Sequence, residues 1–208
     1  MSGRQPARSP LALAVLALLG EAPMHPYRMQ HTLKKRGKDR VVNVRDRASI
    51  YHVIARLERA GLVRAVETAQ SENRPERTVY ALTDDGINTC RRWVAEMLAT
   101  PADEFPELPA ALAFLPVLTP DDAVRQLQAR AASLESRISR ARAELHSYGS
   151  AIPRLFLLEE EYRTAALQTE LDWVRSLVDD LHAGRLTWTK EWLMQVASPS
   201  PTDDLPES

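Results

Sequence analysis

The sequence predicts a mainly α-helical protein with one small β-hairpin, divided into an N-terminal part and a C-terminal part. Apolar residues recur at helical spacing in several segments, and two β-branched or alternating runs flank a polar turn. A third observation is a seam of apolar residues that continues through consecutive heptads near the C-terminus. The chain has 208 residues, of which 44% are hydrophobic, so it is long enough to bury a sizeable core.

Three helices are expected before residue 62. Ser9 and Asp46 can cap the first and the third, while Gly37 and Gly61 can end the second and the third. The apolar run at 11–19 resembles the hydrophobic part of a signal peptide, but it is shorter than the roughly 20 residues that a membrane span needs. We therefore interpret it as a core helix. The predicted helices cover residues 10–20, 26–36 and 47–60.

A β-hairpin and a fourth helix are expected next. Residues 62–67 and 78–82 have strand character, and the polar segment 68–77 between them is predicted to form the turn. Three helices followed by a hairpin describe a winged helix-turn-helix. Thr83 can cap the fourth helix, whose apolar stripe is typical of a core or of a dimer seam. That stripe consists of Ile87, Cys90, Val94 and Met97, with Trp93 beside it.

The C-terminal part is predicted to contain two long antiparallel helices with coiled-coil-like packing. Prolines mark residues 101–119 as a connector that holds a short helix. The first long helix starts near Pro120, and the second, at 155–181, is expected to use Tyr162, Ala166, Trp173 and Leu177 as its apolar face. The expected division is a winged helix domain at 1–100, a connector at 101–119, a helical domain at 120–183, and a terminal segment with a disordered tail at 184–208. The seam of the first long helix is Val124, Leu127, Ala131, Leu134, Ile138, Ala141, Leu145 and Tyr148.

The two halves of the chain carry opposite charge. Residues 1–100 hold 17 Lys+Arg against 10 Asp+Glu, a net of +7, whereas residues 101–208 hold 10 against 18, a net of −8. A basic half suits a polyanion, because Lys and Arg neutralise phosphates and release counterions. The single cysteine, Cys90, excludes an intrachain disulfide and fits a reducing, cytoplasmic location.

The third helix presents the most informative surface. Ser49, His52, Arg56 and Arg59 recur on one face at spacings of three and four, opposite an apolar face of Ile50, Ile54 and Leu57. These polar groups can reach phosphates and base edges, although an ordinary solvated face is the alternative. Because a hairpin follows, we expect the third helix to enter the major groove of DNA, with Arg74 and Arg77 of the wing on the backbone.

Four stretches of the first hundred residues resemble the PadR family of bacterial transcriptional regulators. Pro26, Ala48 and Asn73 stand where that family usually has glycine, which leaves the geometry of those turns open. The matching stretches are the first helix with Ala22-Pro23-Met24-His25-Pro26-Tyr27, Ala48-Ser49-Ile50-Tyr51 with Leu57-Glu58-Arg59-Ala60-Gly61-Leu62, Asn73-Arg74-Pro75, and Tyr80-Ala81-Leu82-Thr83-Asp84-Asp85-Gly86.

The resemblance implies a homodimer that binds a double-stranded operator with two-fold symmetry. It also implies a repressor that a small aromatic effector releases, and a dimer built by the long C-terminal helices with the first helix. The counterpart of Tyr51 in the family contacts the DNA backbone. Trp93 lies on the helix from which some shorter members bind flat aromatic compounds, although a packing residue is the simpler interpretation. The predicted DNA-contacting residues are Ser49, Tyr51, His52, Arg56, Arg74 and Arg77.

Other classes of function fit the sequence less well. The five histidines show no metal-ligand spacing with carboxylates, and no glycine-rich phosphate loop occurs, so neither an enzyme nor a cofactor or metal site is predicted. A helical interaction scaffold would explain residues 120–183 but not the basic face of the first half. An RNA-binding winged helix stays open as an alternative. No membrane partner is expected.

Overall fold

The computed structural model describes residues 7–44, 46–71, 74–148 and 151–197; the side chains of residue 47 and of residues 67–77 are not described. The chain divides into two compact units, Met1–Asp103 and Glu104–Ser208, which are treated separately below. The predicted disordered tail at 198–208 lies outside the described residues.

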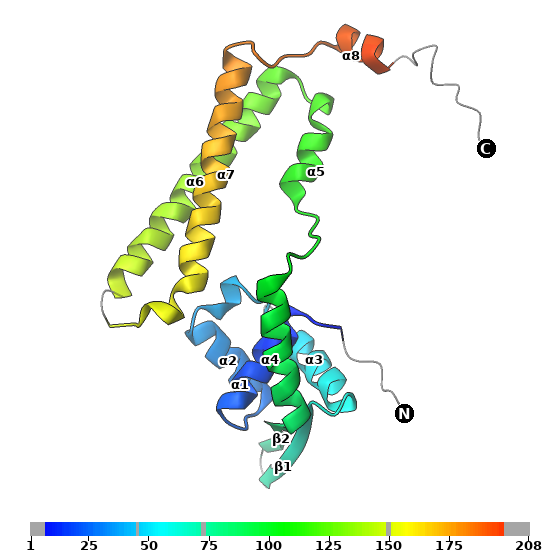
Figure 1. Cartoon of the computed structure of the whole chain (residues 1–208), viewed down its shortest axis with the longest axis vertical. Helices are drawn as coiled ribbons and strands as arrows, with labels where there is room; N and C mark the ends of the chain where they lie inside the picture. Colours follow the sequence, from blue (N-terminus) through cyan, green and yellow to red (C-terminus); the bar gives the residue numbers. More distant parts are fainter. Residues whose placement is uncertain (1–6, 45, 72–73, 149–150, 198–208) are drawn as a thin grey trace, which may run out of the picture. The chain divides into compact units, whose positions relative to one another are not determined.

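The N-terminal unit contains four helices and a hairpin (Figure 1). Its core joins the apolar faces of the helices to the base of the hairpin. The three helices with predicted bounds are confirmed to within one residue, and the fourth begins after its predicted cap, Thr83. In chain order the elements are α1 (Pro10–Glu21), α2 (Pro26–Lys35), the short 3-10 turn η1 (Lys38–Arg40), α3 (Arg47–Arg59), β1 (Val63–Ser71), β2 (Arg74–Leu82) and α4 (Asp84–Ala99).

α1 is the central helix of this unit. It packs against α3, α4 and β2, which explains why its sequence is apolar almost all round. Val15 and Leu16 are completely buried. The helix begins where the Ser9 hydroxyl accepts the backbone N–H of Ala12 (3.2 Å).

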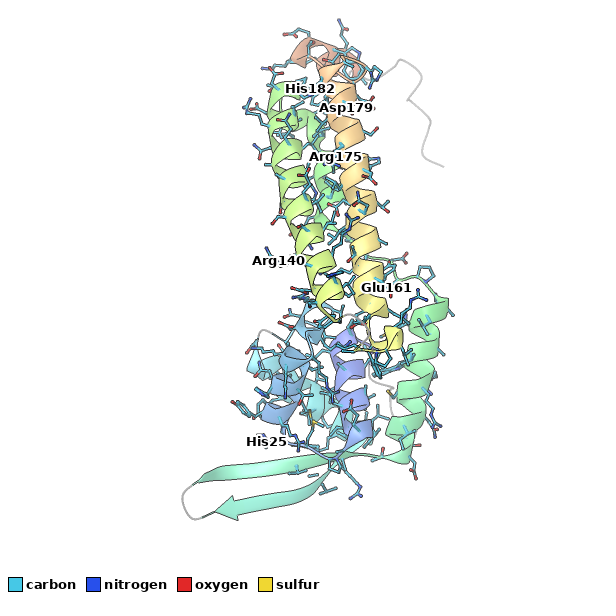
Figure 2. All side chains as sticks on the ribbon, turned by 90° about the vertical axis from the view of Figure 1, so that its left-hand side faces the viewer. His25, Arg140, Glu161, Arg175, Asp179 and His182 are labelled. Carbon is cyan, nitrogen blue, oxygen red and sulfur yellow. The ribbon has the colours of Figure 1, made fainter. Side chains whose placement is uncertain are left out.

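The hairpin is longer than predicted. β1 and β2 pair in antiparallel register from Val63 opposite Leu82 to Ser71 opposite Arg74, with irregularities between Ala65 and Glu67 and between Ala69 and Ser71. The prediction that 68–77 is a long polar turn is therefore wrong. A strand that projects beyond the core needs no apolar side chains to hold its ladder, so its sequence looks like a loop. In Figure 2 the hairpin extends past the helices of its unit.

Hydrogen bonds at two places attach the hairpin to the helices. Met24, in the turn between α1 and α2, exchanges both backbone hydrogen bonds with Tyr80 of β2 (3.0 and 3.2 Å) and so acts as a short third strand. The Thr83 hydroxyl accepts the N–H of Gly86 (3.1 Å) and donates to the carbonyl of Gly61 (2.7 Å). One side chain thus caps α4 and fixes the turn that follows α3.

Gly86 marks the tightest junction in this unit. A Cβ atom built on it would lie 2.1 Å from the backbone oxygen of Leu62 and 2.7 Å from Cδ1 of Leu82. No side chain fits there, because real Cβ atoms do not approach a backbone oxygen so closely. Glycine at this position lets the first turn of α4 lie directly on the start of the hairpin.

We predict that Gly86→Ala lowers the free energy of unfolding by about 3 kcal/mol, because the added methyl group must push α4 away from Leu62. Gly20→Ala is the matched control, because its Cβ would meet only Leu82 Cδ2, at an ordinary contact distance of 3.7 Å. It should therefore raise the free energy of unfolding by about 1 kcal/mol, since alanine favours a helix more than glycine does. Urea titrations followed by circular dichroism measure both. Equal stability of the two variants would contradict the assigned role of Gly86.

The C-terminal unit is an antiparallel pair of long helices with shorter segments attached. Its elements are α5 (Glu107–Ala113), the 3-10 turn η2 (Leu115–Val117), α6 (Pro120–Tyr148), the 3-10 turn η3 (Arg154–Phe156), α7 (Leu158–His182) and α8 (Lys190–Ala197). α6 and α7 lie side by side along their length, as predicted (Figure 1). The helix α8 was not predicted.

The heptad seam of α6 is largely confirmed, because Leu127, Ala131, Leu134, Ile138 and Ala141 are all buried. The predicted face of α7 is wrong. Tyr162 is 77% exposed and Trp173 48% exposed. The two aromatic side chains suggested a core face, but α7 packs against α6 through an aliphatic stripe on a neighbouring face. That stripe consists of Leu167, Leu171, Val174, Val178 and Leu181.

Polar contacts set the register of α6 against α7. Arg130 Nε donates a hydrogen bond to Oε1 of Glu170 (2.6 Å), and Nη2 of the same arginine forms an ion pair with that oxygen (2.5 Å). Arg175 of α7 donates to Glu135 of α6 (2.7 Å). At one end of the unit, the Trp188 indole N–H donates to the carbonyl of Leu118 (2.8 Å). This bond ties the segment after α7 to the start of α6.

Candidate nucleic-acid interface

α3 is held from its inner side by the core of the N-terminal unit. Ile50, Ile54 and Leu57 are at most 1% exposed, which confirms the predicted inward face. The helix begins where the Asp46 carboxylate accepts the backbone N–H of Ala48 (2.9 Å). It ends at Gly61, which adopts the left-handed conformation (φ 72°) that favours glycine.

The loop before α3 is pinned to α2 by a buried amide. Gln30 is 6% exposed, and its Nε2 donates to the carbonyl of Val44 (3.0 Å). A buried carbonyl without a partner is costly, so this bond fixes the path by which the chain enters α3. A second constraint joins the far ends of α1 and α2. Arg36 donates to both carboxylate oxygens of Glu21 (2.5 and 2.7 Å), and this hydrogen bonding lowers the pKa of Glu21.

The outward face of α3 differs slightly from the predicted stripe. Tyr51 is 49% exposed, and His52 and Arg59 are also exposed, whereas Ser49 is half-buried. Between them Ala55 is exposed and small. A short side chain in the middle of the face allows close approach of a base edge, and a methyl group there can contact thymine.

Arg56 lies at the edge of this face, toward the start of α1. It is half-buried, and its Nη2 donates to Oγ of Ser9 (3.3 Å). Its Nε is buried and has no hydrogen-bond partner among the described residues. Arg56 therefore touches the residue that caps α1, and it reaches DNA only if the guanidinium turns away from Ser9.

An acidic residue, Glu58, lies beside the arginines at the C-terminal end of α3. Burial raises the pKa of Tyr80, and the negative charge of the Glu58 carboxylate raises it further. Glu58 is exposed, so its carboxylate would repel a phosphate. The surface best suited to DNA is thus the N-terminal half of α3, the part with which recognition helices read bases.

Tyr27 is a further candidate that was not among the predicted DNA-contacting residues. The structure places it at the start of α2 with 55% of its surface exposed. A cleft of about 30 Å³ separates it from Tyr51, with Pro26, Gln30 and Ile50 as the remaining walls. The two phenol rings thus stand at adjacent helix N-termini, where the helix dipoles favour an anion. The sequence signal for this position of Tyr27 is the preceding Pro26, because proline favours the first turn of a helix.

The wing contributes two of the predicted residues. Arg74 opens β2 opposite Ser71, at the end of the ladder, and Arg77 pairs with Ala69. Their side chains are not described, and Asn73 lies outside the described residues. The backbone nevertheless puts both arginines in the part of the hairpin farthest from its attachment at Met24 and Leu62.

α4 turns a different face to the core than predicted. Gly86, Thr89 and Trp93 are its buried residues, and Trp93 is 3% exposed within the core of the N-terminal unit. This burial favours packing as the role of Trp93. Ile87 and Val94 of the predicted stripe are 36% and 41% exposed, so of the two predicted roles a dimer seam fits them better than a core. Cys90 is half-buried, and burial raises the pKa of its thiol.

The N-terminal unit matches a known family. Its residues 15–92 fit the model of the transcriptional regulator PadR-like family. This part of the chain is therefore similar in sequence to PadR-like regulators. The match covers α1 from Val15 through the first half of α4, which includes every predicted DNA-contacting residue. Members of this family are transcriptional regulators rather than enzymes. No curated protein sequence matches the chain significantly.

Solved structures show the same fold over most of the chain. Bacillus subtilis PadR in complex with operator DNA is 17% identical, covers 82% of this chain and 98% of its own, and superposes with a TM-score of 0.65. The same protein in complex with p-coumaric acid is 16% identical, with coverage of 85% and 99% and a TM-score of 0.63. A PadR-like regulator from Bacillus cereus is 15% identical, covers 86% of this chain and 99% of its own, and superposes with a TM-score of 0.55.

The described part of the chain holds no group of three or more His, Cys, Asp or Glu residues that could bind a metal ion. Within the same residues, every helix is too short or too polar to cross a membrane.

Proposed function

We propose that this protein is a sequence-specific DNA-binding regulator that reads duplex DNA with the N-terminal half of α3. The observation that carries the proposal is the exposed face of Tyr51, His52 and Ala55, held rigidly by the buried face of the same helix. It lies in a half of the chain with a net charge of +7, beside a hairpin that carries arginines. The operator complex of Bacillus subtilis PadR supports this assignment by fold.

The residues divide into groups by the contacts open to them. His52 has an exposed imidazole at the centre of the face, and half-buried Ser49 flanks it, so both meet base edges or nearby phosphates. Tyr51 and Tyr27, at the N-termini of their helices, donate hydrogen bonds from their phenol hydroxyls to phosphates of the DNA backbone. Arg74 and Arg77 of the wing hold the adjacent backbone. Arg56 contributes by fixing the start of α1 through Ser9, and any phosphate contact from it is secondary.

His52→Ala should weaken binding to the specific site by about tenfold and leave binding to random DNA unchanged, because it removes base readout without a wing or backbone contact. The site is first found by selection from random duplexes, which should return a two-fold motif with half-site centres about 34 Å apart. His31→Ala, an exposed histidine of α2, is the matched control. Selection of structured RNA instead of a duplex motif would overturn the proposed function.

Arg74→Ala should weaken specific and random DNA to a similar degree and reduce the salt slope of binding by about one, because one phosphate contact is lost. Arg137→Ala removes the same charge from an exposed position of α6, and it should leave both affinities unchanged. Fluorescence anisotropy at several salt concentrations gives the slopes. An unaltered slope in Arg74→Ala would remove the wing from the interface.

The active form is a homodimer assembled mainly through the C-terminal unit. Several large apolar side chains there are open to solvent in the single chain, among them Phe105 (97%), Val117 (85%) and Phe114 (71%). Several large apolar side chains exposed within one short segment are typical of an interaction site. A symmetric dimer also matches an operator with two-fold symmetry.

Light scattering should give a mass of about twice the 23.4 kDa of one chain at micromolar concentration. Val117→Glu should lower this mass toward that of a monomer, since it puts a charge into the proposed interface. A wild-type protein that stays monomeric at this concentration would contradict the dimer.

Control by a small molecule completes the proposal. Binding of the protein represses transcription, and an effector releases it by preferring the arrangement that does not fit the operator. The p-coumaric acid complex of Bacillus subtilis PadR supports a ligand-responsive design in this fold.

A further inference from the structure

The C-terminal unit contains an apolar groove between α5 and α7. Its volume is about 680 Å³, within the range of small-molecule sites. Leu108 and Leu112 of α5 form one wall, and small side chains of α7, including Ala166, form the floor. Tyr162 and Trp173, which had been expected in the core of the bundle, also line it. The groove therefore accounts for the two aromatic residues that α7 leaves outside its contact with α6.

α5 has no buried residue, although it lies beside the bundle (Figure 1). Leu108 and Leu112 are only half-buried, because the space between them and α7 is empty. The side chains proposed for the dimer, Phe105, Phe114 and Val117, do not line this space. A ligand in the groove would therefore complete the packing of α5 without competing for the dimer surface.

The polar groups of the groove select the class of ligand. Thr169 is already engaged, since its hydroxyl donates to the carbonyl of Ala165 (3.1 Å). Glu170 is the one charged residue of the lining. Its Oε1 accepts a hydrogen bond from Nε of Arg130 and is paired with Nη2 of that arginine, whereas Oε2 accepts no hydrogen bond among the described residues. The groove thus offers apolar surface, aromatic faces and one open carboxylate oxygen.

We propose that this groove binds a flat aromatic compound that carries an amino group. The ring system contacts the small floor residues and the faces of Trp173 and Tyr162, where a cation also gains from the ring quadrupole. The amino group donates to Oε2 of Glu170. An aromatic carboxylate finds no such partner, because Arg130 is already paired, and the net charge of −8 on residues 101–208 repels it.

The test uses a matched pair of compounds, 2-naphthylmethylamine and 2-naphthoate, with the full-length protein in calorimetry without DNA. The amine should bind with a dissociation constant of about 1 mM or tighter, one per chain, and roughly tenfold better than the carboxylate. Ala166→Phe should abolish binding by filling the floor. Ala143→Phe, at an exposed position of α6 outside the groove, should bind like the wild type.

Glu170→Gln keeps the shape of the side chain and serves if Ala166→Phe does not fold. It should remove the preference for the amine, because the charged oxygen that pairs with the amino group is replaced by a neutral amide. The proposal is overturned if the amine does not bind, if the wild type prefers naphthoate, or if Ala166→Phe binds normally. It is also overturned if Ala166→Phe breaks the dimer while neither compound binds, since a second copy then fills the groove.

The claim that the groove is the effector site depends on the function proposed above. The claim that the groove binds the amine does not. Saturating amine should change the affinity of the wild type for its selected operator and leave that of Ala166→Phe unchanged. An unaltered affinity would overturn the effector role alone. Failure of the wild type to select any duplex would overturn the proposed function and leave the calorimetric result standing.

Discussion

The burial of α1 is the constraint on which the proposed DNA-binding surface depends. This helix packs against α3, α4 and the hairpin, so the pose of the reading helix is fixed by apolar contacts rather than by the polar residues that it displays. Burial of apolar side chains such as Val15 and Leu16 supplies the free energy. Ser9, Gln30 and Thr83 then add directional hydrogen bonds at the ends of the helices. The outer face of α3 is consequently free to change without loss of the fold.

Much of the N-terminal unit could be predicted because its local rules agree with one another. Ser9, Asp46 and Thr83 cap helices as expected, and Gly37 and Gly61 end them. The outer part of the hairpin could not be predicted, because a two-stranded ribbon away from the core needs no apolar alternation. The face of α7 was misassigned for the opposite reason: aromatic residues line a groove that the sequence does not reveal.

The candidate site was predictable in position but not in detail. Helical spacing located the face that contains Ser49 and His52. It could not show that Arg56 is drawn toward Ser9, because that contact joins residues far apart in the chain. Nor could it show that Tyr27 is exposed beside Tyr51, since the approach of two helix ends is a tertiary feature. Spacing defines a face, whereas the neighbouring elements decide which side chains on it stay open.

The ion pairs between α6 and α7 have a consequence for how the bundle can evolve. An apolar seam that repeats every seven residues looks the same after a slide of one heptad, so hydrophobic packing alone leaves the register degenerate. Arg130 with Glu170 and Arg175 with Glu135 remove that degeneracy, since a slide separates both pairs. A shorter or longer bundle would therefore have to lose or gain heptads in both helices together, which keeps the two arms equal in length.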